Sequence, residues 1–195
     1  MQIYLDTIIK ELKSSIDLHN AILSEPKILN TLSSAALNAS HSISKGGKIF
    51  FAGNGGSFAD SQHLAAEFIG TMGFLRPSLP AISLGTNSSN VTAISNDFSF
   101  DEIFLREFSA LATKNDFLFL ISTSGNSKNL IPVGEFARSI GSNGLILTGK
   151  TGGSLAGIFP TIIVPHNRTE RIQEVHILLG HIFCQLIEYS LGYYE

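Results

Sequence analysis

The sequence has a single cysteine, Cys184, so no disulfide can form within the chain. Charge is also scarce: 15% of the residues are charged, no run is rich in lysine or arginine, and the formal net charge is −3. Nucleic acids and anionic membranes are therefore poor candidates for the main partner. The N-terminus does not read as a signal peptide, and the apolar stretches are too short to span a bilayer. These absences favour a cytoplasmic protein.

What the sequence does contain is typical of a globular protein. Hydrophobic residues make up 44% of its 195 residues, enough to build one sizeable core. We therefore expect residues 1–195 to form a single domain. The combination of few charges and many apolar residues also predicts a surface buried against other subunits.

The order of apolar patterns predicts the fold. Residues 3–23 and 26–43 have helical spacing and predict an N-terminal helical hairpin within residues 1–45. Residues 46–195 alternate short apolar runs with helix-like segments and end in a long helix over 168–191. The expected strands are residues 48–52, 79–84, 117–121, 145–147 and 161–164, separated by helices over 58–69, 101–111 and 129–140. This alternation predicts an α/β fold with a doubly wound, five-stranded parallel sheet.

The first candidate phosphate loop, residues 53–57, reads Gly-Asn-Gly-Gly-Ser between a strand and a helix. Gly55 and Gly56 allow backbone N–H groups to approach an anion, and the helix N-terminus adds a partial positive charge. Ser57 could bind phosphate or cap the helix. Taken alone, this loop slightly favours a tight turn with a serine cap.

The second loop, residues 122–127, reads Ser-Thr-Ser-Gly-Asn-Ser and also joins a strand to a helix. Four hydroxyls in six residues exceed what a helix cap requires. Ligands of open parallel sheets bind beyond the carboxyl ends of the strands, where both loops fall. Two such loops in equivalent places predict a phosphate site.

A rival motif lies at residues 144–151, which match the P-loop pattern G-x-x-x-x-G-K-[ST]. Its middle residues, 145–148, are mostly apolar and are needed as a strand, whereas a P-loop is an exposed loop. We therefore interpret the match as chance.

The candidates for proton transfer lie on two predicted helices. His63 and Glu67 are four residues apart and share a helix face, and His181 lies on the C-terminal helix. A carboxylate base and an imidazole acid suit the interconversion of a ketose and an aldose, and with the amide oxygen of Gln173 these side chains also form a plausible zinc set. Taken separately, a His/Glu pair at this spacing is usually a surface pair, and His181 alone is also compatible with a hydrogen-bonded packing role.

Gln173 and His181 are eight residues apart, about 12 Å along a straight helix. One ion could hardly bind both from the same helix. We infer that the two reach different sites and that each site takes residues from more than one chain. His166 and His176 are interpreted as structural or surface residues.

Several stretches together resemble the sugar isomerase (SIS) domain family and, within it, the phosphoheptose isomerases. The matching pieces cover nearly the whole chain and are residues 53–57, 60–63, 65–67, 76–77, 92–97, 121–127, 171–174 and 180–181. The resemblance implies a flavodoxin-like SIS fold and conversion of sedoheptulose 7-phosphate to D-glycero-D-manno-heptose 7-phosphate through an enediol. It also implies the first step of nucleotide-activated heptose synthesis for surface glycans such as lipopolysaccharide or capsule.

The resemblance further implies a homotetramer with active sites at subunit interfaces. Glu67 and His181 match the family's acid/base pair, and one Zn²⁺ per subunit is implied at His63, Glu67, Gln173 and His181. Phosphate contacts are implied at Ser57, Ser122, Thr123, Ser124 and Ser127. Contacts to the sugar are implied at Asn54, Asp97 and Gln173.

Three positions depart from the family pattern. Thr71 stands where an arginine is usual, Asn87 where an aspartate is usual, and Glu170 where aspartate or a small residue is common. These departures bear on the identity of the substrate and not on the acid/base pair.

Two other functions fit parts of the sequence. One is a non-catalytic SIS-domain protein that binds a sugar phosphate or a replication-initiator protein. Related SIS proteins that bind the bacterial replication initiator lack the catalytic Glu and His, whereas this chain has Glu67 and His181. A sugar-phosphate-sensing regulatory domain usually accompanies a DNA-binding module, for which this sequence has no room. The enzyme is therefore the favoured interpretation.

Overall fold

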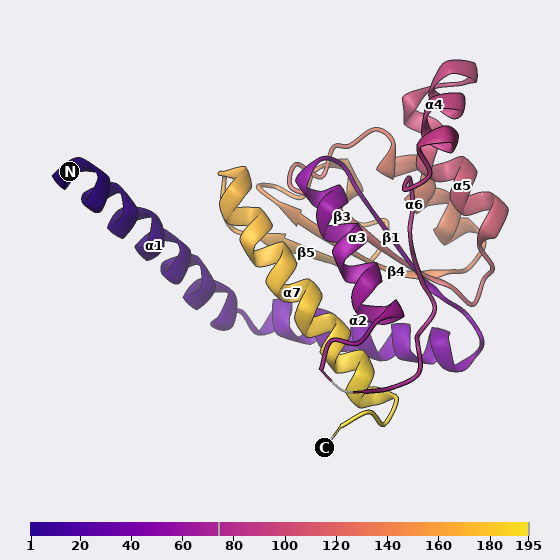
Figure 1. The fold of residues 1–195 in the computed structure, drawn as a ribbon, viewed down its shortest axis with the longest axis horizontal. Helices are drawn as coiled ribbons and strands as arrows, with labels where there is room; N and C mark the ends of the chain where they lie inside the picture. Colours follow the sequence, from indigo (N-terminus) through magenta and orange to yellow (C-terminus); the bar gives the residue numbers. More distant parts are fainter. Residues whose placement is uncertain (74, 195) are drawn as a thin grey trace.

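The computed structural model describes residues 1–73 and 75–194, and its core is one parallel sheet (Figure 1). The strand order is β2-β1-β3-β4-β5, and every neighbouring pair is parallel. The strands are β1 (Ile49–Gly53), β2 (Ala81–Ser83), β3 (Phe117–Ser122), β4 (Asn143–Gly149) and β5 (Thr161–Val164). The predicted doubly wound α/β fold is confirmed.

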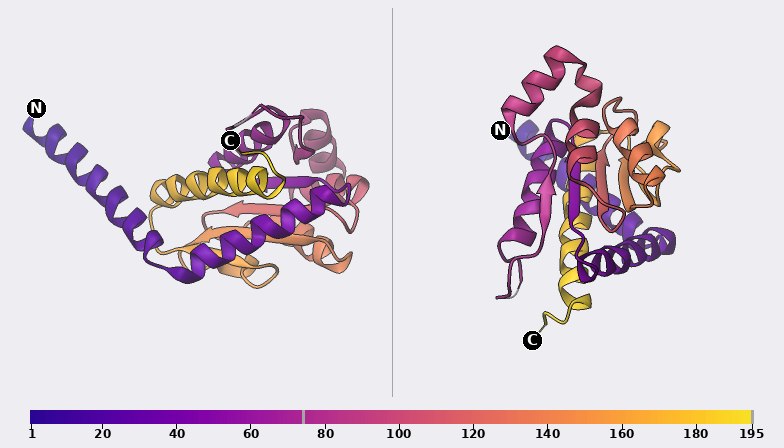
Figure 2. Two further views of the ribbon diagram at one scale, coloured as in Figure 1. Left: turned by 90° about the horizontal axis from the view of Figure 1, so that it is seen from below. Right: turned by 90° about the vertical axis from the view of Figure 1, so that its right-hand side faces the viewer.

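Helices cover both faces of the sheet (Figure 2). The helices α2 (Pro26–Ser44), α3 (Gly56–Ile69) and α7 (Thr169–Ser190) pack in one hydrophobic cluster with the sheet. A second cluster on the other face contains α5 (Ile103–Leu111) and α6 (Leu130–Ser139). β1 and β3 are buried along their whole length, as strands with helices on both faces should be.

The strands lie where the apolar runs predict them, including β4, which contains residues 144–148 of the P-loop match. The interpretation of that match as chance is thus supported by the structure. Among residues 1–73 and 75–194, one α-helix was not predicted: α4 (Ser88–Asp97), which has no fully buried residue. Its sequence is mostly Ser, Asn and Thr, so it lacks the apolar stripe that reveals a helix. Instead, the side chain of Asn87 starts it by accepting hydrogen bonds from the backbone N–H groups of Ser89 and Asn90.

The N-terminal hairpin is open. Both expected helices form, but α1 (Gln2–Leu23) projects away from the body and does not lie along α2 (Figures 1 and 2). Glu25 is extended, as a residue before proline tends to be, so the chain changes direction at Pro26. The middle of α1 is held by α7: Arg171 donates to the carbonyl of Glu11 at 3.0 Å, and the Ser15 hydroxyl donates to the Glu174 carboxylate at 3.0 Å.

Among the residues that the structure describes, no helix combines the length and the apolar character needed to cross a membrane.

Candidate active site

The two Ser- and Gly-rich loops meet at the carboxyl edge of the sheet. β1 ends at Gly53 and its neighbour β3 ends at Ser122, so the loops that follow lie side by side. Two reciprocal hydrogen bonds join them: the Asn54 amide donates to Asn129 at 2.8 Å, and the Asn129 amide donates back at 2.9 Å. Asn129 is buried and was not among the predicted site residues. Its only sequence signal is an Asn at the start of a helix.

The first loop is shaped by glycine. Gly55 has a φ of +58° and is the N-cap of α3, with no side-chain cap hydrogen bond. The alternative interpretation of Ser57 as the helix cap is therefore wrong, because Ser57 lies inside the first turn, where it is buried. Gly56 lies against the end of the Gln173 side chain: a Cβ there would come within 2.3 Å of the Gln173 amide nitrogen, so this amide would have to move.

The second loop is held by its own hydroxyls. Ser122 and Ser127 share a hydrogen bond of 2.9 Å between their Oγ atoms, and Ser124 Oγ accepts from the backbone N–H of Asn126 at 3.2 Å. Gly125 has a φ of +66°, and its backbone lies against that of Gly152. The hydroxyls of this loop are thereby gathered at one end of β3.

Helices α3 and α7 run side by side in the same direction, and their alignment builds the rest of the site. At the start of α3, Gln173 lies against Gly56. Further along both helices, Gly180 of α7 lies against Leu64 of α3. A Cβ on Gly180 would come within 2.6 Å of a Leu64 methyl group. Glycine at position 180 thus lets the two helices approach closely beside His181.

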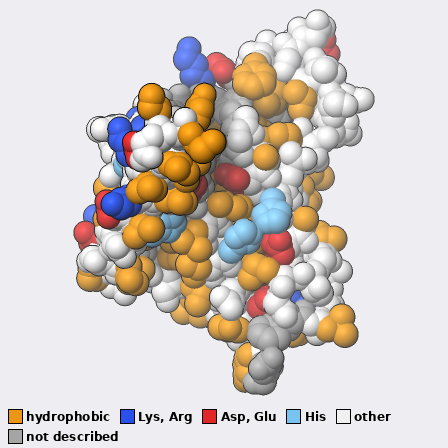
Figure 3. Space-filling model, turned by 60° about the vertical axis from the view of Figure 1, so that its left-hand side comes forward, with side chains coloured by type: hydrophobic (Ala, Val, Ile, Leu, Met, Phe, Trp, Pro, Cys, Tyr) orange, Lys and Arg blue, Asp and Glu red, His pale blue; other side chains and the backbone are white. Residues whose placement is uncertain are grey.

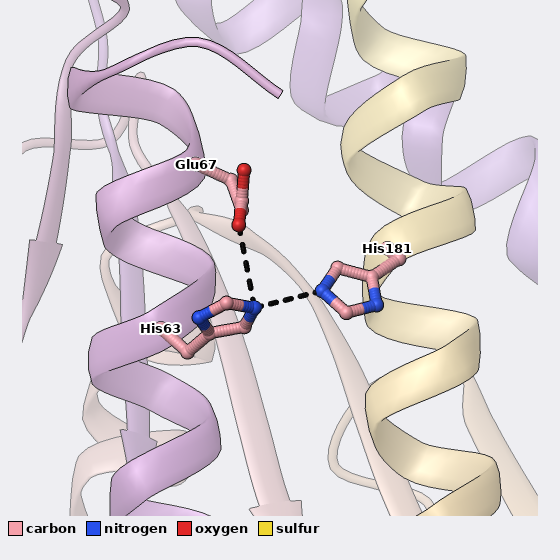
Figure 4. Close-up of side chains that lie close together, drawn as sticks. All are labelled: His63, Glu67 and His181. Atoms are coloured by element: carbon pink, nitrogen blue, oxygen red, sulfur yellow. Dashed lines mark hydrogen bonds and ion pairs between the residues drawn. The ribbon is translucent and has the colours of Figure 1, made fainter. Parts of the chain in front are cut away.

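His63 and Glu67 from α3 meet His181 from α7 (Figure 4). His63 Nε2 is 2.8 Å from His181 Nε2 and 3.3 Å from a carboxylate oxygen of Glu67. The side chain of His63 is 51% exposed and that of Glu67 is 18% exposed, so the cluster opens to solvent. One turn earlier on α3, partial burial raises the pKa of the Asp60 carboxyl, opposed by the charge of His63.

This cluster could hold a metal ion. Two imidazole nitrogens and one carboxylate oxygen lie within 4.8 Å of one another. Nitrogen and oxygen donors of this kind suit a divalent transition metal, and three protein ligands leave room for another ligand. Because the Nε2 atoms of His63 and His181 face each other, both imidazoles present the nitrogen that could bind a metal to the same place.

The predicted site residues do not all meet within one chain. Gln173 lies at the first loop, away from the cluster, as its separation from His181 along α7 requires. Asp97 is exposed at the end of α4, where its carboxylate accepts a hydrogen bond from Asn96 at 2.8 Å. One chain therefore brings together His63, Glu67 and His181, and leaves Gln173 and Asp97 outside that group.

His176, interpreted from sequence as structural or surface, is in the core. Its Nε2 lies 3.0 Å from the carbonyl of Thr148, so this nitrogen carries the proton and donates. Its Nδ1 is buried with no hydrogen-bond partner among the described residues. Burial lowers the pKa of His176 to about 4.

This shift predicts a pH dependence of stability. Between about pH 6.5 and pH 4, His176 is protonated in the unfolded chain, where its pKa is about 6.5, but stays neutral in the folded chain. The free energy of unfolding therefore falls as the pH drops through this range. We expect wild type to lose about 2 kcal/mol more than His176→Gln between pH 7 and pH 5 in denaturant unfolding. Gln preserves a donor to Thr148 but does not titrate. Equal losses in the two proteins would show that His176 does not titrate on unfolding.

Comparisons with known proteins agree with one another. The model of the SIS domain family matches residues 16–149. A phosphoheptose isomerase from Aneurinibacillus thermoaerophilus is 42% identical over 187 residues, covering 95% of this chain and 94% of that protein. The structure of a phosphoheptose isomerase from Francisella tularensis superposes with a TM-score of 0.89 at 30% identity, covering 95% of this chain and 98% of that one. That of phosphoheptose isomerase from Neisseria gonorrhoeae gives 0.85 at 37% identity, covering 94% and 99%.

Proposed function

The chain belongs to the SIS domain family, and we propose that it is a phosphoheptose isomerase, which converts sedoheptulose 7-phosphate to D-glycero-D-manno-heptose 7-phosphate. The observation that carries this proposal is the meeting of Glu67 and His181 from two helices in one solvent-accessible cluster. A carboxylate beside an imidazole is the pair that aldose–ketose isomerisation needs. The identity to named phosphoheptose isomerases over most of the chain supports the substrate.

The proposed chemistry is a proton transfer between neighbouring carbons. The Glu67 carboxylate takes a proton from C1 of the ketose, and the C–H electrons form the C1–C2 double bond. The carbonyl oxygen at C2 takes a proton from His181, which gives the enediol. Returning a proton from Glu67 to C2, while the C1 hydroxyl gives its proton back to the imidazole, forms the aldehyde and restores both residues.

We propose Zn²⁺ as the ion of the cluster, held by His63, Glu67 and His181 and joined by Gln173. When bound, the ion would polarise the substrate carbonyl. The N/N/O donor set supports this choice because zinc accepts both imidazole and carboxylate ligands. Since Gln173 lies at Gly56 in the same chain, the Gln173 that joins the cluster is proposed to come from a neighbouring subunit.

The phosphate is proposed to bind at the two loops, through Ser57, Ser122, Thr123, Ser124 and Ser127, with the backbone N–H groups of Gly55 and Gly56. The sugar is proposed to contact Asn54, Asp97 and Gln173. Hydroxyl and amide donors at a helix N-terminus are well suited to a phosphate monoester.

Substituting one loop hydroxyl should weaken binding without stopping proton transfer. We expect Ser124→Ala to lose roughly 1.5–3 kcal/mol of substrate binding, seen as a raised KM, because a hydrogen bond to a charged group is lost. The control is Ser139→Ala, which removes an exposed hydroxyl on α6 that donates to the Phe136 carbonyl of its own helix. A collapse of kcat at unchanged KM would place Ser124 in the chemistry and contradict this assignment.

We also propose a homotetramer with active sites between subunits. Seven large apolar side chains of α1 are at least 50% exposed: Ile3, Tyr4, Ile8, Ile9, Leu12, Ile16 and Leu23. A surface of this kind usually marks a protein interface. An open hollow of about 710 Å³ beneath α1, beside Pro165 and His166, offers room for several side chains of a second copy. On the face in Figure 3, histidine and acidic side chains lie together among hydrophobic ones, as expected for a site completed by a neighbour.

The product class suggests the place of the reaction. A heptose phosphate of this configuration suits the first step of nucleotide-activated heptose synthesis for lipopolysaccharide, capsule or another surface glycan. The cytoplasm is the proposed compartment, in keeping with a lone, buried cysteine.

The direct test is to incubate the purified protein, loaded with zinc, with sedoheptulose 7-phosphate and related ketose phosphates and to identify the products. We expect the heptose aldose phosphate to form fastest from the seven-carbon substrate. If only a different ketose phosphate is turned over, the substrate has changed, and the Thr71 and Asn87 departures are the residues to which we would attribute the change. Binding without any turnover would favour a non-catalytic sugar-phosphate binder.

A further inference from the structure

A buried ion pair links the segment that follows α3 to α7. Arg76 Nε is 2.6 Å from a carboxylate oxygen of Glu188, and both side chains are 1% exposed. The second carboxylate oxygen of Glu188 is buried and has no hydrogen-bond partner within residues 1–73 and 75–194. Such an incompletely satisfied buried pair contributes less to stability than well-packed apolar side chains would. The attraction between the two charges alone therefore does not explain why Arg76 and Glu188 lie in the core.

Arg76 also completes the C-terminus of α3. The last carbonyls of a helix lack partners within the helix. The Arg76 guanidinium donates to the carbonyl of Glu67 at 2.8 Å and to that of Phe68 at 3.0 Å, and it reaches those of Gly70 and Pro77 at 3.3 and 3.1 Å. One side chain thus holds the backbone of Glu67 itself.

Glu188 is placed to pass this restraint on to His181. It lies seven residues after His181, two turns along the same face of α7 and about 10 Å away along the axis. On the other side of His181, Gly180 packs against Leu64 of α3. The Gly180–Leu64 contact and the Arg76–Glu188 ion pair therefore hold α7 against α3 and the segment after it, on both sides of the point where Glu67 and His181 meet.

From this geometry we infer that Arg76 and Glu188 are positioning residues, which form an interhelical clamp that holds Glu67 and His181 at their working separation. The clamp touches neither the substrate nor a metal, and it acts through the backbone of α3 and through α7. The inference rests on the proposed function in one respect, since the pair that it positions is the proposed acid/base pair.

The deciding variant is Arg76→Lys. Lysine keeps the charge beside Glu188 but lacks the planar fork that reaches the Glu67 and Phe68 carbonyls. We expect kcat to fall about 10-fold, KM to stay within about twofold, and the affinity for zinc ion alone to weaken about 10-fold, in the usual range for residues that orient metal ligands. Zinc affinity is measured without substrate, by competition with a chromophoric chelator.

A second variant separates positioning from folding. Arg76→Met with Glu188→Leu removes both charges together, so no unpaired charge stays buried and the variant should fold. Its melting temperature should be lower than that of wild type, because the carbonyls of Glu67 and Phe68 lose their donor. Its kcat and zinc affinity should fall as in Arg76→Lys. This variant decides the matter if Arg76→Lys does not fold.

The matched control is Asp116→Asn. Asp116 is also fully buried and paired with a cation, Lys48, but it precedes β3 at the opposite edge of the sheet from the loops. The Asp116→Asn substitution should lower the melting temperature while kcat and zinc affinity stay at wild-type values. Wild-type kcat and zinc affinity in the folded Arg76 variants would overturn the clamp, as would an equal loss in Asp116→Asn. If the protein proves not to isomerise sugar phosphates, the zinc measurement still tests the clamp by itself.

Discussion

Glu67→Gln is expected to lower kcat by at least about 10²-fold, the usual scale for loss of a general base. The amide has the size of the carboxylate and can still accept a hydrogen bond from His63, 3.3 Å away in the wild type. It cannot accept the carbon-bound proton, however. Because the fold of α3 does not depend on this partly exposed side chain, the melting temperature should change little.

Glu67 is also a proposed metal ligand, so the kinetics must be measured at saturating zinc with metal content determined. The control is Glu102→Gln, which alters a carboxylate in another i, i+4 pair, with Arg106, on the surface. Its kcat should equal that of wild type. Near-normal turnover by zinc-loaded Glu67→Gln would remove Glu67 from the proton transfer.

Mixing inactive subunits should restore activity only for certain pairs. His63, Glu67 and His181 meet within one chain, whereas Gln173 lies at Gly56. If Gln173 reaches the cluster of a neighbouring subunit, Glu67→Gln and Gln173→Ala subunits complement each other. Some mixed interfaces then hold an intact set, about one site in four for random pairing of equal amounts. The expected result is a large recovery from two nearly inactive proteins.

The pair Glu67→Gln and His181→Ala is the matched control for this experiment. Both residues belong to the same chain's cluster, so every mixed site stays damaged and no recovery is expected. Subunit exchange must be demonstrated with tagged chains, and the oligomer itself by light scattering, with activity lost on dilution to monomers. Recovery in the control pair, or none with Gln173→Ala despite exchange, would contradict the proposed sharing of residues.

Much of the fold could be predicted because the relevant patterns are local. Runs such as residues 117–121 are apolar throughout, as a strand covered on both faces must be, and the loops after β1 and β3 carry their own glycines and hydroxyls. The helix α4 could not be predicted in this way, because its start depends on the Asn87 side chain and its mostly polar sequence contributes only the partly buried Val91 and Ile94 to the core. The direction of α1 could not be predicted either, because helical spacing does not say against what a helix packs.

The sequence by itself determined the fold class, the two candidate phosphate loops and the residue types for proton transfer, since these depend on neighbours along the chain. It also placed His63 beside Glu67, and separated Gln173 from His181, because helix geometry sets distances within one helix. Only the tertiary structure decided which residues of different helices meet. The close approach of Gly180 to Leu64 sets the alignment of α3 with α7, and this brings His181 to His63, Gln173 to Gly56 and Glu188 to Arg76. Such contacts join residues more than a hundred positions apart, and they depend on how complementary surfaces pack, which spacing along the chain does not encode.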